Sequence, residues 1–208
     1  MKGVYIFLAD GFEEIEALAP VDILRRGGIG VTTVAINECE EDDGDIYCRV
    51  VTGAHGVPVA ADISLIQFLE EQSELSDGEV TPEDVMIFPG GMPGAKNLAS
   101  CTALMDMLVQ HGRLGGTIAA ICASPAIVLA GKLPDEVIAG RKMTCYDSME
   151  GPIERRGAEY VKEGVVVDGN LITSRGPAFA EEFGLTILAA LAGKDVADAV
   201  AKGMLRSL

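Results

Sequence analysis

The sequence has few basic residues, and this shortage excludes several classes of protein. Sixteen lysine and arginine residues stand against 32 aspartate and glutamate residues, which gives a formal net charge of −16 at pH 7. A surface with this charge repels phosphate backbones and anionic lipid headgroups. We therefore expect neither nucleic acid nor a membrane as a partner.

Long apolar runs and sets of metal ligands are lacking as well. No apolar segment approaches the roughly 20 residues that a membrane-spanning helix requires. The five cysteines, at positions 39, 48, 101, 122 and 145, form no CxxC pair, and neither His55 nor His111 has cysteines at zinc spacing. We therefore expect no metal site, no cofactor and a reducing, cytoplasmic environment.

Short apolar runs alternate with helical patterns along the chain. This alternation predicts an α/β fold with mostly parallel strands, right-handed crossovers and helices on both faces of the sheet. A hydrophobic content of 49% in 208 residues suits one domain over residues 1–208. Strands are predicted at Val4–Ala9, Val31–Ile36, Val85–Phe88, Thr117–Ile121 and Leu171–Thr173, and helices at Glu13–Arg26, Cys101–His111, Pro125–Leu129, Pro177–Leu191 and Val196–Leu205.

An excursion at residues 37–82 interrupts this alternation. It holds an acidic loop at residues 38–45, a predicted strand pair at Ile46–Val51 and Val57–Ala60, and a polar stretch at Glu70–Pro82. The acidic loop lacks the ligand spacing of an EF-hand. We therefore interpret the acidic segments as solvated loops rather than a metal site.

Cys122 lies where a strand pattern changes into a helix pattern. After it come small residues and Pro125, and proline suits the first turn of a helix. A thiolate at this junction would be favoured by the helix dipole and by free backbone N–H groups. We interpret this turn as a nucleophile elbow, with Cys122 as the nucleophile. The alternative is a cysteine that packs as a small buried hydrophobe.

A glycine-rich turn, Pro89–Gly94, follows another predicted strand. Open α/β sheets place ligand sites at the carboxyl ends of their strands, and glycines let backbone N–H groups approach a reacting oxygen. No Gly-Lys-Ser/Thr follows, so the turn is not a P-loop. The alternative is a tight turn without chemistry.

Glu16 lies on an apolar stripe of the first predicted helix. We interpret Glu13 and Glu14 as acidic side chains that interact favourably with the positive end of the helix dipole. Glu16 differs, because Phe12 and Ile23 are among its neighbours at helical spacing. Burial would raise its pKa, and a protonated carboxyl group can donate a hydrogen bond to a thiolate. If the first strand and the Cys122 strand are neighbours, the two side chains meet. The thiol pKa should then fall from about 8.5 to about 5.5.

Four motifs together resemble the ThiJ/PfpI family, in the branch of the Parkinson-associated protein deglycase. They are Ala119–Ala123, Pro89–Gly91, Gly11–Glu16 with Pro20–Asp22, and Leu171–Pro177. The resemblance implies a flavodoxin-like fold and a homodimer. It also implies that Cys122 is the nucleophile, that Glu16 is the protonated acid beside it, and that the Gly91 and Ala123 N–H groups form an oxyanion pocket.

The chain departs from the family pattern at two positions. Tyr146 stands where many members have a histidine near the cysteine, and a neutral phenol is no general base near pH 7. Ala123 stands where the protease-like branch has a histidine, so peptidase activity is not expected.

His55 aligns with an arginine that, in several relatives, reaches the partner subunit's cysteine. We predict that His55 of one subunit approaches Cys122 of the other, where it serves as a proton carrier or, with Arg175, holds a substrate carboxylate. The alternative is an exposed loop histidine.

These residues predict an enzyme that acts on small 2-oxoaldehydes such as methylglyoxal, or on their protein adducts, in the manner of a glyoxalase III or a deglycase. The alternative is a redox sensor or stress-protective chaperone that works through oxidation of Cys122. A third interpretation is a structural domain with an inert cysteine.

Overall fold

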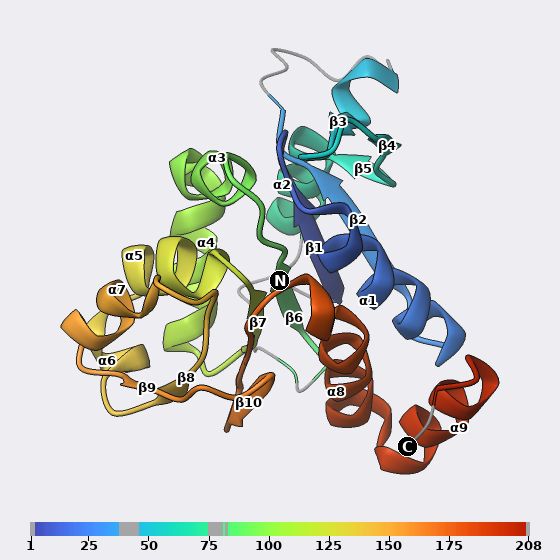
Figure 1. Ribbon diagram of the computed structural model, residues 1–208. Helices are drawn as coiled ribbons and strands as arrows, with labels where there is room; N and C mark the ends of the chain where they lie inside the picture. Colours follow the sequence, from blue (N-terminus) through green and yellow to red (C-terminus); the bar gives the residue numbers. More distant parts are fainter. Residues whose placement is uncertain (1–2, 38–45, 75–80, 82, 207–208) are drawn as a thin grey trace.

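Helices cover both faces of a mostly parallel sheet in the computed structural model of the chain, which describes residues 3–37, 46–74, 81 and 83–206 (Figure 1). The strand order is β10 (Val165–Asp168), β11 (Leu171–Ser174), β7 (Thr117–Ile121), β6 (Val85–Phe88), β1 (Val4–Leu8), β2 (Val31–Ala35) and β5 (Ile63–Ser64). β10 and β11 pair antiparallel, and the other neighbours pair parallel. The predicted α/β class is confirmed.

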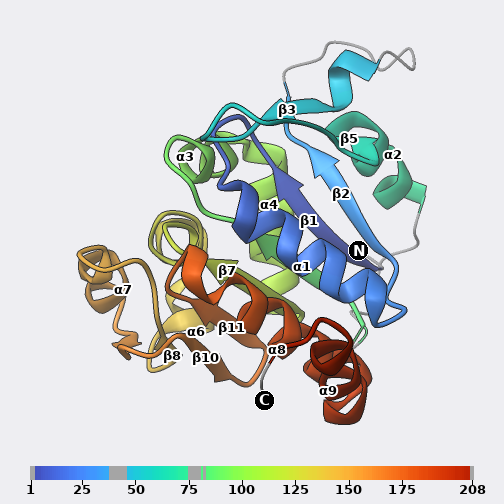
Figure 2. The same ribbon diagram turned by 45° about the vertical axis from the view of Figure 1, so that its right-hand side comes forward.

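Two apolar cores lie on opposite sides of the sheet, because successive side chains of a strand point to opposite faces. In β1, Tyr5 and Phe7 enter one core, whereas Val4, Ile6 and Leu8 enter the other. The first core is covered by α2 (Leu65–Glu74), α3 (Gly94–Ser100) and α4 (Thr102–Arg113), and the second by α1 (Glu14–Arg26), α8 (Ala180–Ala192) and α9 (Lys194–Gly203). Figure 2 shows α1 and α8 side by side on one face. With both faces covered, the ends of the strands are left for chemistry.

Short elements fill the chain between β7 and β10. They are a π-helical turn (Pro125–Leu129), α5 (Ala130–Lys132), α6 (Asp135–Ile138), β8 (Lys142–Met143), α7 (Glu150–Arg155) and β9 (Glu159–Tyr160). A 3-10 turn, Pro177–Phe179, leads from β11 into α8. Most of these elements were not predicted, because such short segments carry no readable period. In the described part of the chain, no helix combines the length and apolarity needed to cross a membrane.

The excursion between β2 and β6 differs in part from the prediction. Residues 46–49 form a 3-10 turn rather than the start of a strand, and the hairpin consists of β3 (Val50–Thr52) and β4 (Pro58–Ala60). Residues 70–74, expected in a polar loop, belong to α2, because Phe68 anchors this helix in the core. The predicted acidic loop at residues 38–45 lies outside the described residues.

The cysteines in the described residues differ in their state. Cys48 is disulfide-bonded, which the cysteine spacing did not predict. Cys101, Cys122 and Cys145 are free thiols, and Cys122 is half-buried. A reactive-thiol role for Cys122 is therefore compatible with its state.

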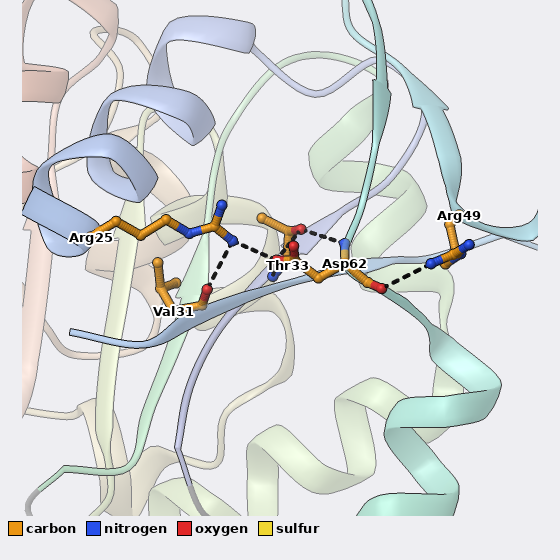
Figure 3. Close-up of polar contacts among 5 residues, drawn as sticks. All are labelled: Arg25, Val31, Thr33, Arg49 and Asp62. Atoms are coloured by element: carbon orange, nitrogen blue, oxygen red, sulfur yellow. Dashed lines mark hydrogen bonds and ion pairs between the residues drawn. The ribbon is translucent and has the colours of Figure 1, made fainter. Parts of the chain in front are cut away.

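Asp62 joins the edge of the sheet to α1 and to the 3-10 turn that precedes the hairpin (Figure 3). Its Oδ2 accepts hydrogen bonds from the Thr33 N–H and hydroxyl at 2.8 Å and from the Arg25 guanidinium at 2.6 Å. Arg25 also donates to the Val31 carbonyl, and Arg49 donates to the Asp62 carbonyl. Burial alone would raise the pKa of Asp62, but the Thr33 and Arg25 donors outweigh burial and lower it. One carboxylate thus ties β2 to α1.

Replacing Asp62 with alanine should lower the free energy of unfolding by about 2 kcal/mol, because the buried Thr33 loses its hydrogen-bond acceptor. Urea denaturation followed by circular dichroism measures this loss. Asp22→Ala is a matched control, since Asp22 forms an exposed pair with Arg26 and its removal should cost less than about 0.5 kcal/mol. Equal losses in the two variants would contradict the role given to Asp62.

Candidate active site

The predicted site residues gather at the carboxyl ends of three strands. Glu16 lies in the first turn of α1, which follows β1, while Gly91 follows β6 and Cys122 follows β7. The helices that follow β1 and β6 cover opposite faces of the sheet. This is the topological switch point, at which open α/β sheets bind ligands.

Cys122 has a left-handed backbone conformation, with a φ of 65°, although it is not glycine. Such a conformation costs about 1–2 kcal/mol, so neighbouring groups must hold it. The Cys122 N–H donates to the Ser174 carbonyl of β11 at 2.8 Å, and its carbonyl accepts the Tyr146 N–H at 2.8 Å. The chain therefore makes the sharp turn that the sequence predicted at this residue.

The Glu16 side chain is fully buried. Its Oε2 accepts the Gly90 N–H at 2.9 Å, and its Oε1 has no hydrogen-bond partner among the described residues. Burial raises the pKa of Glu16 to about 7, although hydrogen bonds with Cys122 and Gly90 oppose the rise. The carboxyl group therefore changes protonation near neutral pH, as a proton shuttle requires.

Glu16 and Cys122 meet although their strands are not neighbours. We expected the two side chains to meet only if β1 and β7 were neighbours. This condition is not fulfilled, because β6 lies between the two strands. They interact because Gly90, just after β6, has no side chain. A Cβ atom there would lie 2.6 Å from Cys122 Cβ and 2.6 Å from Glu16 Oε2. The missing side chain leaves the space in which thiol and carboxyl group interact.

Gly90→Ala should lower the kcat/KM for the reaction proposed below by about 100-fold, because the added methyl group forces Glu16 and Cys122 apart. Steady-state kinetics measures this effect, and thermal unfolding shows whether the variant is folded. Gly203→Ala is the matched control, since a Cβ atom there meets nothing within 4 Å. Unchanged kinetics in a folded Gly90→Ala protein would refute this account of the contact.

The backbone N–H groups of Gly91 and Ala123 donate hydrogen bonds to the Cys122 sulfur. Gly91 has a φ of +92°, and a Cβ atom there would lie 2.4 Å from the Gly11 carbonyl oxygen. Only glycine fits this backbone, which brings the N–H group to the thiol. Two donors that converge on one point can stabilise a negative charge on sulfur or on an oxygen bound beside it.

The thiol and the carboxyl group titrate as a coupled pair. Burial and the adjacent Glu16 carboxylate raise the pKa of Cys122 to about 12, and the Gly91 and Ala123 N–H groups offset only part of this rise. The expectation of a strongly acidic thiol is therefore wrong while Glu16 is ionised, because it neglected burial. The pair loses its first proton near pH 7. Above this pH, the Glu16 carboxyl group and the Cys122 thiol together carry one negative charge and one remaining proton. A thiolate exists when that proton is on Glu16.

Tyr146 and Arg175 lie beside the elbow. The Tyr146 side chain is half-exposed, and the Arg175 guanidinium donates to Asp147 at 2.6 Å and lies 5.6 Å from the centroid of the Phe179 ring. Asp147 also pairs with Lys162 at 3.2 Å, and hydrogen bonds from both cations lower the pKa of Asp147. A substrate carboxylate must therefore compete with Asp147 for Arg175.

His55 lies against the start of α1. Its Nδ1 is 2.9 Å from Glu14 Oε2 and 3.5 Å from Glu13 Oε2, and its N–H donates to Glu14 Oε1 at 2.8 Å. The hydrogen bond with Glu14 and the charge of Glu13 raise the pKa of His55. Glu14 is thus not merely a complement to the helix dipole, because it is buried and holds the tip of the β3–β4 hairpin. The approach of His55 to a partner's Cys122 stays a prediction.

Glu13, Glu14 and His55 also form a group that could hold a metal ion. One ligand atom from each lies within 4.8 Å of the others. The hydrogen bond between His55 and Glu14 already accounts for this grouping, so we assign no metal to it.

Sequence reasoning missed three residues that shape the site. Ser174 holds the Cys122 backbone, Gly90 makes room for the Glu16 contact, and Asp147 occupies Arg175. Gly90 could have been found, because it precedes Gly91 at the end of a buried strand. Ser174 and Asp147 act through contacts distant in sequence, which no local pattern marks.

The fold and this geometry define an α/β protein with a free cysteine on a strand-to-helix elbow beside a buried carboxyl group. Residues 2–190 match the DJ-1/PfpI family, and the chain belongs to this family. The family indicated by the four sequence motifs is thereby confirmed.

Individual relatives match over nearly the whole chain. Protein dj-1beta of Drosophila melanogaster is 35% identical over 204 residues, which cover 98% of this chain and 97% of that protein. The glutathione-independent glyoxalase DJR-1.2 of Caenorhabditis elegans is 30% identical over 190 residues, covering 91% and 88%. The solved structure of oxidized Toxoplasma gondii DJ-1 has a TM-score of 0.82 and 32% identity, covering 99% of this chain and 98% of that chain.

Proposed function

We propose that this chain is a cysteine-dependent enzyme that acts on small 2-oxoaldehydes such as methylglyoxal, or on their protein adducts, without a cofactor. The proposal rests on the surroundings of the Cys122 sulfur. This sulfur accepts hydrogen bonds from two backbone N–H groups and lies beside a carboxyl group with a pKa of about 7. A relative that is 30% identical bears the name of a glutathione-independent glyoxalase, which favours the same substrate class.

In the first step, the Cys122 thiolate attacks the aldehyde carbon. A C–S bond forms, and the electron pair of the C=O bond moves to oxygen, where the Gly91 and Ala123 N–H groups stabilise the anion. Glu16 supplies the proton that this oxygen takes up. The product is a hemithioacetal on Cys122.

In the second step, Glu16 moves a proton within the adduct. It removes the proton from the former aldehyde carbon, and the adjacent keto carbon receives a proton through an enediol. The aldehyde carbon is thereby oxidised and the keto carbon reduced, so no external oxidant is needed. The resulting thioester reacts with water, which releases a 2-hydroxy acid such as lactate and restores the thiol.

The proposal is tested by incubating the protein with methylglyoxal, without glutathione and with EDTA present. Proton NMR should show loss of methylglyoxal and an equal gain of lactate, well above the rate in buffer. No lactate above the buffer rate would overturn the glyoxalase activity. The same assay with a methylglyoxal-modified peptide distinguishes action on adducts from action on the free aldehyde.

Oxidation of Cys122 is a second candidate function, because the Gly91 and Ala123 N–H groups could equally hold the oxygens of a sulfinate. A thiolate oxidises more readily than a thiol. Mass spectrometry after mild peroxide treatment tests this function. A stable sulfinate at Cys122 in a protein without turnover would favour a sensor over an enzyme.

A homodimer is part of the proposal. Ile15 and Leu18 on α1 and Val57 at the hairpin tip are exposed apolar side chains, and Glu14 joins α1 to that tip. Exposed apolar side chains on these two neighbouring segments favour contact with a second copy. Light scattering should give twice the chain mass, and Val57→Asp should shift the equilibrium toward the monomer.

A further inference from the structure

A cavity of about 270 Å³ is lined by Tyr146, Asp147 and residues 175–179, and two of its lining residues, Gly176 and Tyr146, lie beside the Cys122–Glu16 pair. Gly176 is the lining residue that approaches Glu16. A Cβ atom on Gly176 would lie 3.5 Å from the Tyr146 ring and 3.9 Å from Glu16 Oε1. The Tyr146 N–H donates a hydrogen bond to the Cys122 carbonyl, which holds Tyr146 beside the elbow. The cavity therefore shares Gly176 and Tyr146 with the surroundings of the Cys122–Glu16 pair.

The walls of the cavity suit a planar apolar group. Tyr146 contributes a half-exposed ring, and Phe179 and Pro177 contribute two further rings. A cavity of about 150 Å³ is large enough for benzene, so this one has room for a phenyl group. Next to Gly176, Glu16 Oε1 is buried without a hydrogen-bond partner in the described residues, so it can accept a hydrogen bond from a substrate hydroxyl that reaches it.

The charged groups at the cavity favour a substrate with an aromatic ring over a substrate with a carboxylate, because the carboxylate of Asp147 is already there. Arg175 is held over the Phe179 ring by Asp147, and a fixed guanidinium attracts the face of an aromatic group. A carboxylate would have to displace Asp147, which already binds both Arg175 and Lys162. An uncharged ring leaves these ion pairs intact.

We propose that this cavity binds the substituent of the 2-oxoaldehyde and prefers an aryl group, with Tyr146 and Phe179 as specificity-determining residues. The inference rests on the proposed function, because it takes Cys122 as the atom that attacks the aldehyde. The substrate class is then the arylglyoxals, of which phenylglyoxal is the simplest probe.

The experiment compares kcat/KM for phenylglyoxal and methylglyoxal, using initial rates and intact mass to exclude arginine modification. The wild-type ratio should exceed about ten in favour of phenylglyoxal. Tyr146→Ala removes an exposed side chain and should lower the ratio about tenfold.

Two glycine substitutions sharpen the comparison. Gly176→Ala is compatible with the extended backbone, where φ is 164°, and should also lower the ratio, because its methyl group would take up space between the Tyr146 ring and Glu16 Oε1. Gly30→Ala is the matched control, since a Cβ atom there meets nothing within 4 Å and the ratio should not change.

Binding of the product acids gives a readout that does not depend on turnover. In titration calorimetry, the wild-type protein should bind mandelate at least about tenfold more tightly than lactate, and Tyr146→Ala should lose this preference. A wild-type ratio of one or less, or ratios unchanged in both Tyr146→Ala and Gly176→Ala, would overturn the aryl site. If neither aldehyde is turned over, the proposed function fails, and the titration still decides whether the cavity selects a ring.

Discussion

Replacing Cys122 with alanine should reduce the turnover of methylglyoxal to the rate in buffer. The Cys122 sulfur forms the bond to the aldehyde carbon, so without it neither the hemithioacetal nor the thioester can form. We expect kcat/KM to fall by at least about 10³-fold, because losing the nucleophile removes the whole covalent route. Lactate formation followed by NMR measures the fall.

The matched control is Cys101→Ala. Cys101 is also a free, partly buried thiol, but it precedes α4 and lines a different cavity. This variant should keep wild-type kinetics. Substantial lactate formation by Cys122→Ala would show that the reaction does not pass through this sulfur and would remove the proposed mechanism.

Five strands of the sheet, β1, β2, β6, β7 and β11, could be predicted from the sequence because nearly all of their residues are buried. β1 and β6, for example, have every residue buried, which produces continuous apolar runs. β5, β8 and β9 have two residues each, and their pairing depends on neighbours far away in the chain. Their existence is a tertiary effect that no local period records.

The positions of Cys122 and Glu16 and the raised pKa of Glu16 could be predicted, but the pKa of the Cys122 thiol could not. The strand-to-helix change marks Cys122, and the apolar stripe marks the burial of Glu16. The thiol pKa depends on how far the sulfur is desolvated and on the charge of its neighbour, which are properties of the assembled site. The role of Gly90 also depends on strand order, since β6 separates the two reacting groups.

Replacing Glu16 with glutamine should lower kcat/KM by about 10²–10⁴-fold, because glutamine cannot carry the proton between carbon and oxygen. In the wild-type protein, kcat/KM should rise with pH through about 7, as the Cys122–Glu16 pair loses its first proton. In Glu16→Gln this rise near pH 7 should disappear. Glu16→Gln also removes the negative charge that helps to raise the pKa of Cys122 to about 12. Iodoacetamide should therefore label Cys122 of this variant with a pH midpoint below 12.

The same substitution should stabilise the fold at alkaline pH. The pKa of Glu16 is raised from its ordinary value of 4.5 to about 7 in the folded protein, so the folded state holds this proton more tightly than the unfolded state does. The resulting stability is complete below about pH 4.5 and is lost as the pH rises through 7. At about 1.4 kcal/mol per pKa unit, the loss at pH 8 is about 3 kcal/mol. Urea denaturation at pH 5 and pH 8 should therefore show Glu16→Gln gaining stability over the wild-type protein as the pH increases. A constant difference between the two proteins would mean that Glu16 does not ionise in this range, and that the shared proton on which the mechanism depends is absent.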